Sequence, residues 1–137
     1  MRVLFYIEPL IELDQPLMKA PWIVQANRFA KLLLQSDIQP HCLSFIVPET
    51  LLSYAHKTLP EGVTIRAIKH ETFLNTLGKN SIDIAIKRYT DTYESAEITP
   101  LANQIRGLLT GFRPDIALTF SSAPELQVAW PDLITLH

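Results

Sequence analysis

Short apolar runs alternate with longer amphipathic stretches along this chain. Four of the runs predict strands, and they cover residues 3–7, 42–47, 115–120 and 132–136. The first run is apolar on both faces, which is typical of a strand buried inside a parallel sheet. Residues 63–68 alternate between apolar and polar side chains after a turn-forming sequence, and they predict a fifth, more peripheral strand.

The stretches between these runs predict helices. Residues 22–34 form the clearest amphipathic pattern of the first half, with polar side chains at Gln25, Arg28, Lys31 and Gln35. The opposite, apolar stripe of this helix consists of Trp22, Ile23, Ala26, Phe29, Ala30, Leu33 and Leu34.

A second clear helix is expected over residues 98–112, where Thr99 supplies a capping hydroxyl and Pro100 lies in the first turn. Weaker patterns predict short helices over 49–57 and 126–130, a helical turn or two over 70–77, and a helix over 82–95. The isoleucines of this last segment also alternate as they would in a strand.

Strands that alternate with helices imply right-handed crossovers. The expected fold is therefore α/β, a doubly wound and mainly parallel sheet flanked by helices, as in Rossmann-like domains. Residues 1–137 have the length of one domain. The sequence stops directly after a strand, with no closing helix, so we expect one lobe of a longer polypeptide.

Composition narrows the class of protein. With 47% hydrophobic and 19% charged residues the chain can bury a core, and a net charge of −2 argues against nucleic acid as a partner. Cys42 is the single cysteine, which favours a reducing compartment, and the sequence holds no apolar window of membrane-spanning length. We expect a cytoplasmic protein, with peripheral attachment to the inner face of the membrane left open.

Several familiar motifs are missing. The chain has four glycines where average usage gives about ten. The first strand is followed by Glu8-Pro9-Leu10 instead of a glycine-rich dinucleotide loop, and neither a phosphate-binding P-loop nor a nucleophile elbow occurs. The four histidines form no close pair with another ligand residue, so no metal site is expected.

Ligands of open α/β sheets bind at the carboxyl ends of the strands, and chemically useful side chains occur at these ends. Glu8, Glu125 and His137 are the candidate catalytic residues, each suited to act as a base. The alternatives are a solvated Glu8, a loop role for Glu125 and a frayed chain end at His137.

Four further residues are candidates for substrate binding. Ser121 and Ser122 follow a strand and are suited to bind a sugar hydroxyl or a phosphate, although a serine-rich turn that caps the next helix is the plainer interpretation. Pro21 and Trp22 open the first helix, where backbone N–H groups favour an anion. The plainer role for Trp22 is to anchor the core.

Three segments carry a resemblance to a known family. They are residues 36–45 with the strand and helix before them, the sequence Phe112-Arg113-Pro114-Asp115-Ile116-Ala117-Leu118-Thr119-Phe120, and residues 130–137. Together these segments resemble the amino-terminal lobe of glycosyltransferases with the GT-B fold. The chain departs from the family pattern in its first loop, which has no glycine, and in Asp37-Ile38-Gln39-Pro40, which replaces the usual glycine before His41.

The resemblance implies a two-lobed transferase that moves a sugar from a nucleotide-sugar donor to an acceptor hydroxyl, for example in surface polysaccharide biosynthesis. This chain would be the lobe that binds the acceptor, a glycan or glycolipid. The nucleotide sugar would lie mostly in a carboxyl-terminal lobe that this sequence lacks, so the chain alone would be inactive. The resemblance also implies no metal and no cofactor besides the donor substrate.

Two other functions remain open. One is a stand-alone Rossmann-like module that binds or interacts without catalysis. The other is a small hydrolase that uses Ser121 or Ser122, which the absence of any paired histidine disfavours.

Overall fold

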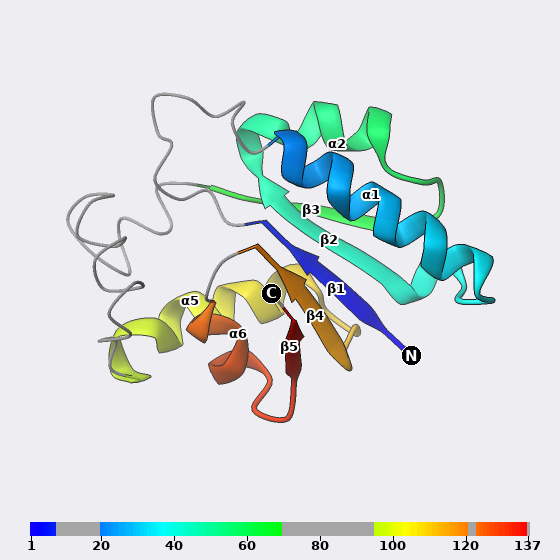
Figure 1. Ribbon diagram of the computed structural model, residues 1–137. Coiled ribbons are helices and arrows are strands. Elements are labelled where there is room, and N and C mark those ends of the chain that lie inside the picture. Colours follow the sequence, from blue (N-terminus) through cyan, green and yellow to red (C-terminus); the bar gives the residue numbers. More distant parts are fainter. Residues whose placement is uncertain (8–19, 70–94, 121–122, 137) are drawn as a thin grey trace.

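The computed structural model describes residues 1–7, 20–69, 95–120 and 123–136 (Figure 1). Its elements follow the chain in the order β1 (Val3–Tyr6), α1 (Ala20–Gln35), η2 (Pro40–Cys42), β2 (Leu43–Pro48), η3 (Glu49–Leu51), α2 (Leu52–Thr58), β3 (Thr64–Ile68), α5 (Ser95–Leu108), β4 (Ile116–Thr119), α6 (Pro124–Ala129) and β5 (Ile134–Leu136). The helices expected over 70–77 and over most of 82–95 lie outside the described residues.

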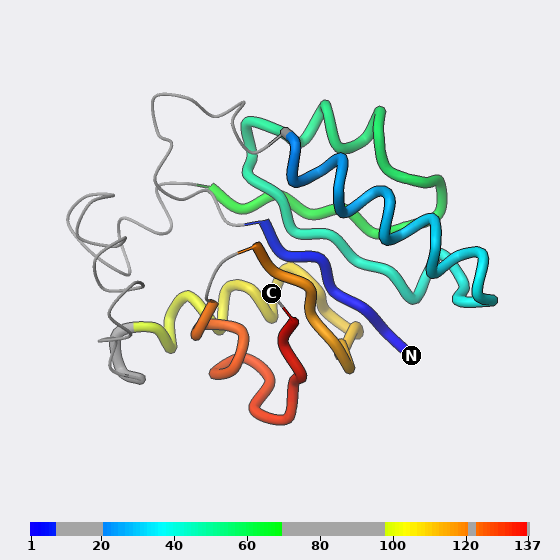
Figure 2. Tube along the Cα trace, viewed as in Figure 1, coloured from blue at the N-terminus to red at the C-terminus, as the bar shows by residue number. Residues whose placement is uncertain are grey.

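The strands form one five-stranded sheet in the order β3-β2-β1-β4-β5, and every neighbouring pair is parallel. In Figure 2 the chain crosses from β1 to one edge of the sheet and later returns to the other side of β1. This arrangement confirms the expected doubly wound, Rossmann-like α/β fold.

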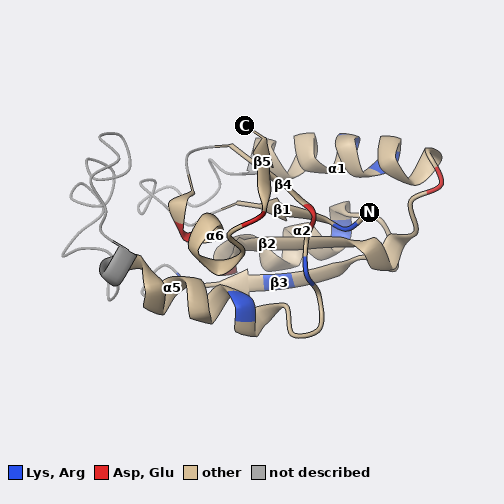
Figure 3. Ribbon diagram, turned by 90° about the horizontal axis from the view of Figure 1, so that it is seen from below, with Lys and Arg blue, Asp and Glu red and all other residues tan. Residues whose placement is uncertain are grey.

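Alternation along the strands divides the core into two layers. Val3 and Phe5 of β1 belong to the apolar cluster under α1 and α2, whereas Leu4 and Tyr6 belong to the cluster under α5 and α6. Figure 3 shows α1 and α5 on opposite sides of the sheet. The central strand is therefore apolar on both faces because each face is covered by helices.

The first layer is centred on a pair of stacked rings. Phe5 of β1 lies opposite Phe45 of β2 in the strand register, and their rings are parallel within 6° with centroids 4.5 Å apart. Both side chains are buried. Offset stacking of this kind adds about 0.5–1.5 kcal/mol to what burial of the rings contributes.

The second long helix begins earlier than the sequence pattern predicts. Because α5 starts at Ser95, Thr99 does not cap it, and Pro100 lies inside the helix. Proline lacks the N–H group that would bond the carbonyl four residues earlier. Pro100 itself is exposed, and the earlier start allows Ile98, which is 4% exposed, to pack into the core.

The predicted apolar stripe of α1 is wrong at Phe29, whose side chain is 52% exposed. Phe29 follows Trp22 by seven residues, so both lie on the side of α1 that faces β4. On this face of the sheet, Ile116 of β4 is paired with Ile134 of β5. On the α1 side, Leu118 of β4 packs against the cluster under α1, whereas Ile134 and Leu136 of the edge strand β5 stay exposed.

The last strand is also shorter and more exposed than expected. It covers three residues instead of 132–136, and its side chains Ile134 and Leu136 are 58% and 48% exposed. The reason is its place at the sheet edge beside the uncovered face. No described helix combines the length and the apolar character that crossing a bilayer requires.

Candidate functional site

The carboxyl ends of β1 and β4 mark the point where the winding of the sheet reverses. Tyr6 ends β1 and Thr119 ends β4, and these two residues are partners in the strand register. The helix α1 that follows β1 lies on one face, and the helix α6 that follows β4 lies on the other. Such switch points are where ligands of doubly wound sheets bind.

A buried polar pair occupies the α6 side of this point. The phenol of Tyr6 donates a hydrogen bond of 2.7 Å to Oε2 of Glu125, and both residues are 0% exposed. Glu125 lies in the first turn of α6, so the bond fastens the start of that helix to the central strand. A buried carboxyl group needs such a partner because it has lost its contacts with water.

This geometry gives Glu125 a structural task. A general base must come within about 3 Å of the hydroxyl that it deprotonates, directly or through one water. The Glu125 carboxyl group instead faces the phenol of Tyr6 inside the core. In the described arrangement it holds β1 and α6 together.

A second, weaker bond closes the neighbouring strand ends. The Thr119 hydroxyl donates to the backbone carbonyl of Leu136 over 3.5 Å. Thr119 is 4% exposed and its side chain points to the same face as that of its register partner Tyr6. The ends of β1, β4 and β5 are thus each fixed by a polar contact as well as by the sheet ladder.

Aromatic rings form the α1 side of the switch point. Trp22, in the first turn of α1, stacks on Phe120 directly after β4, with ring centroids 5.1 Å apart and planes 13° apart. Both side chains are half-buried. Trp22 therefore links α1 to the end of β4 and leaves part of the indole at the surface.

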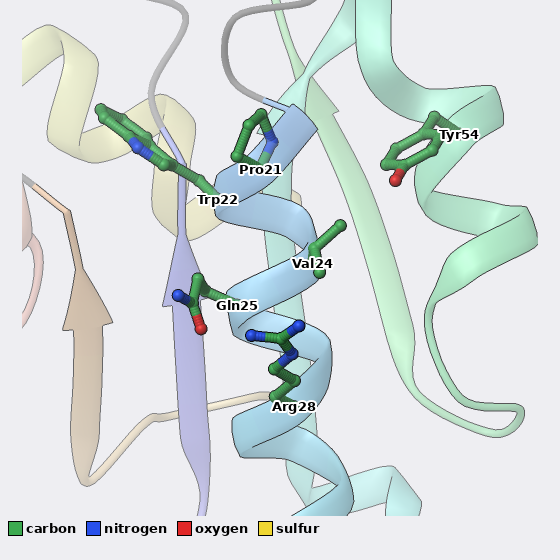
Figure 4. A pocket seen from close by; sticks show the side chains of 6 residues that line it. All are labelled: Pro21, Trp22, Val24, Gln25, Arg28 and Tyr54. Atoms are coloured by element: carbon green, nitrogen blue, oxygen red, sulfur yellow. The ribbon is translucent and has the colours of Figure 1, made fainter.

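A surface pocket of about 490 Å³ begins at the same tryptophan. Among the described residues, Pro21, Trp22, Val24, Gln25, Arg28 and Tyr54 line it. In Figure 4, Val24 points from α1 toward Tyr54 on α2, and Arg28 extends from the outer side of α1. The candidate substrate-binding residues Pro21 and Trp22 both lie here.

The sequence analysis missed four members of this lining, Val24, Gln25, Arg28 and Tyr54. Gln25 and Arg28 appear in the sequence pattern only as polar positions of an amphipathic helix. Their spacing after Pro21 already puts Pro21, Gln25 and Arg28 on one side of α1. Tyr54 gives no sequence signal, because its place in the pocket depends on how α2 packs beside α1.

The remaining candidates stay predictions. Glu8, Ser121, Ser122 and His137 all lie outside the described residues. Within the described ranges, no three side chains of histidine, cysteine, aspartate or glutamate lie close enough together to hold a metal ion.

Comparison with known proteins adds no relative to this picture. The chain matches no protein-family model, no curated protein and no solved structure.

Proposed function

We propose that this chain is the acceptor-side lobe of a glycosyltransferase with the GT-B fold. The whole enzyme would transfer a sugar from a nucleotide-sugar donor to a hydroxyl of a glycan or glycolipid, in surface polysaccharide or glycoconjugate biosynthesis. It would work in the cytoplasm, at the inner face of the membrane where a glycolipid acceptor is presented.

The observation that carries the proposal is the switch point between β1 and β4 with Trp22 beside it. The Rossmann-like sheet agrees with the single lobe that the resemblance implies, and the segments that resemble the family include β4 and β5. The partly exposed indole of Trp22 offers an apolar face to a sugar ring at the edge where ligands of such sheets bind.

The proposed chemistry is attack of the acceptor hydroxyl on the anomeric carbon, with departure of a nucleoside diphosphate. A base at the carboxyl edge would take the hydroxyl proton in an inverting reaction. Glu8 and His137 are the better candidates for that base, since Glu125 is buried against Tyr6. Charged groups of the second lobe would stabilise the leaving diphosphate.

The test uses the full-length protein encoded by the complete reading frame. The proposal predicts that this frame continues past His137 into a second α/β lobe, and that the product releases nucleoside diphosphate from a nucleotide sugar when a suitable acceptor is added. Turnover would be followed across a panel of nucleotide sugars and lipid-linked or free glycan acceptors. A frame that stops at His137, or no hydrolysis and no transfer with any donor, would contradict it.

A matched pair of variants locates the acceptor. Trp22→Ala removes the ring that stacks beside the switch point. Phe29→Ala removes an exposed ring seven residues farther along the same helix, on the same side. We expect Trp22→Ala to raise the acceptor KM by about tenfold, and Phe29→Ala to leave it unchanged. An equal change of the acceptor KM in the two variants would show that the acceptor does not bind at this edge.

One observation favours a different function. Glu125 is the described carboxyl group nearest in sequence to the end of β4, and it is fully buried. That suits a stand-alone Rossmann-like module that binds a ligand without catalysis. Such a module would bind its ligand at the same edge, with an association constant that does not depend on Glu8 or His137.

A further inference from the structure

The pocket on α1 and α2 combines a cation with apolar walls. Its volume of about 490 Å³ falls in the size range of small-molecule sites, roughly 300–1,000 Å³. Arg28 and Gln25 supply polar groups, and the remaining lining residues are Pro21, Trp22, Val24 and Tyr54. A few polar groups on a mainly apolar lining are what fixes the orientation of a bound organic molecule.

Arg28 has the chemistry of an anion receptor. Its guanidinium is exposed, and within the described part of the chain it forms no ion pair with a carboxylate. The planar fork of an arginine matches the two oxygens of a phosphate or carboxylate, which gives both strength and direction to the contact.

The charge around the pocket agrees with an anionic ligand. The sequences of α1 and α2 contain arginine and lysine and no aspartate or glutamate, although the whole chain has a net charge of −2. Figure 3 shows basic segments along α1 and no acidic segment within it. Glu49 precedes α2 in η3 and does not line the pocket.

The walls favour a ligand that also carries a ring. The Tyr54 ring is 38% exposed on α2 and faces Val24 across the pocket, with Pro21 at one end (Figure 4). An aromatic and two aliphatic surfaces so placed can cover both sides of a flat group. A simple inorganic anion would leave these surfaces in contact with water.

We propose that this pocket binds a ring-bearing organic anion, whose phosphate or carboxylate group contacts Arg28 and whose ring lies between Tyr54 and Val24. The inference goes beyond the proposed function, because the binding requires no sugar transfer and is centred on Val24, Arg28 and Tyr54, between α1 and α2.

The experiment is an NMR titration of the 137-residue chain with four probes: phenyl phosphate, benzoate, inorganic phosphate and benzyl alcohol. Phenyl phosphate or benzoate should shift the backbone amides of residues 21–28 and Tyr54 in a saturable way. Which of the two binds more tightly tells phosphate from carboxylate. Inorganic phosphate and benzyl alcohol should each bind at least tenfold more weakly than the better ring-bearing anion.

Matched variants test the two halves of the ligand. Arg28→Gln should weaken binding of the ring-bearing anion by about tenfold. Lys31→Gln removes an exposed cation of the same helix outside the pocket and should change the affinity less than twofold. Tyr54→Ala should weaken it by about fivefold, and Phe29→Ala, outside the lining, should not. All four side chains are exposed, so the fold should survive each change.

Three results would overturn the proposal. Equal losses in Arg28→Gln and Lys31→Gln would show diffuse attraction to a basic helix. If inorganic phosphate binds as tightly as the ring-bearing anion, the ring contributes nothing to the affinity. If benzyl alcohol binds as tightly, the anionic group contributes nothing. None of these results depends on whether the full-length protein transfers a sugar.

Discussion

Tyr6 and Glu125 are separated by 119 positions in sequence, and their side chains meet in a hydrogen bond of 2.7 Å inside the core. The bond joins the last residue of the central strand to the first turn of α6. It therefore fixes the start of α6 against the central strand, at the edge where we propose that the acceptor binds.

Tyr6→Phe should lower the free energy of unfolding by about 1–3 kcal/mol, because it removes a hydrogen bond to a buried carboxyl group. Urea unfolding followed by circular dichroism measures the loss. Glu125→Gln retains an oxygen that can accept from the phenol, so its loss should be smaller than that of Tyr6→Phe. A loss below about 0.5 kcal/mol in Tyr6→Phe would mean that the bond contributes nothing to stability.

Glu125→Gln also separates structure from catalysis. If Glu125 holds β1 to α6, the proposed transferase with this substitution should keep its turnover within about threefold of the original. If Glu125 is the base, turnover falls by at least about a hundredfold while the unfolding curve barely moves. We expect the first outcome, measured as release of nucleoside diphosphate.

Phe45→Ala should destabilise the domain by about 3–5 kcal/mol, because it removes a buried ring and its stack with Phe5. Phe45→Leu retains most of the volume and should lose less, so it stays measurable if the alanine variant fails to fold. Phe29→Ala is the control, with an expected change under about 0.5 kcal/mol because that ring is 52% exposed. Similar losses at both positions would contradict the division between core and surface.

Gly62 and Gly111 offer a comparison of backbone strain with crowding. Both have positive φ angles, 87° and 80°, which cost an alanine about 1 kcal/mol or more. A Cβ atom on Gly62 would lie 2.9 Å from Cβ of Pro40, whereas one on Gly111 would meet open space. Gly62→Ala should therefore lose more stability than Gly111→Ala in thermal unfolding, and equal losses would show that Pro40 moves aside freely.

Leu133 and Ile134 are neighbours with opposite environments. Leu133 is 6% exposed in the cluster under α5 and α6, and Ile134 is 58% exposed on the uncovered face. Leu133→Ala should cost about 2–5 kcal/mol in the 137-residue chain, and Ile134→Ala under about 1 kcal/mol. In the two-lobed protein that we propose, a large loss in Ile134→Ala would indicate that another part of the polypeptide packs on this face.

The sequence predicts the elements of the described fold better than it predicts their surroundings. Strand and helix periodicity identify β1, β2 and α1 within one or two residues, because alternation and helical spacing are local properties. The exposure of Phe29 and Ile134 could not be predicted in this way, because it depends on which face of the sheet other elements cover.

The candidate site shows the same limit. Its place at the carboxyl edge, together with Trp22 and Glu125, follows from the order of elements alone. The pairing of Glu125 with Tyr6 does not, because the two residues come from opposite ends of the chain and meet only after the sheet is assembled. The predicted start of α5 is wrong because a proline after threonine usually marks the beginning of a helix. Here the burial of Ile98 favours an earlier start.

The unequal covering of the sheet implies a gradient in how easily its strands open. The residues of β1 are at most 2% exposed, and the strand has hydrogen-bonded neighbours on both sides, so its amide protons should exchange with solvent only when the whole domain unfolds. Strand β5 has three residues, one neighbour and an uncovered face, so its amides should exchange through a local opening that leaves the rest native. That opening would free the edge of β4, next to the residues that line the switch point, without disturbing the central strand.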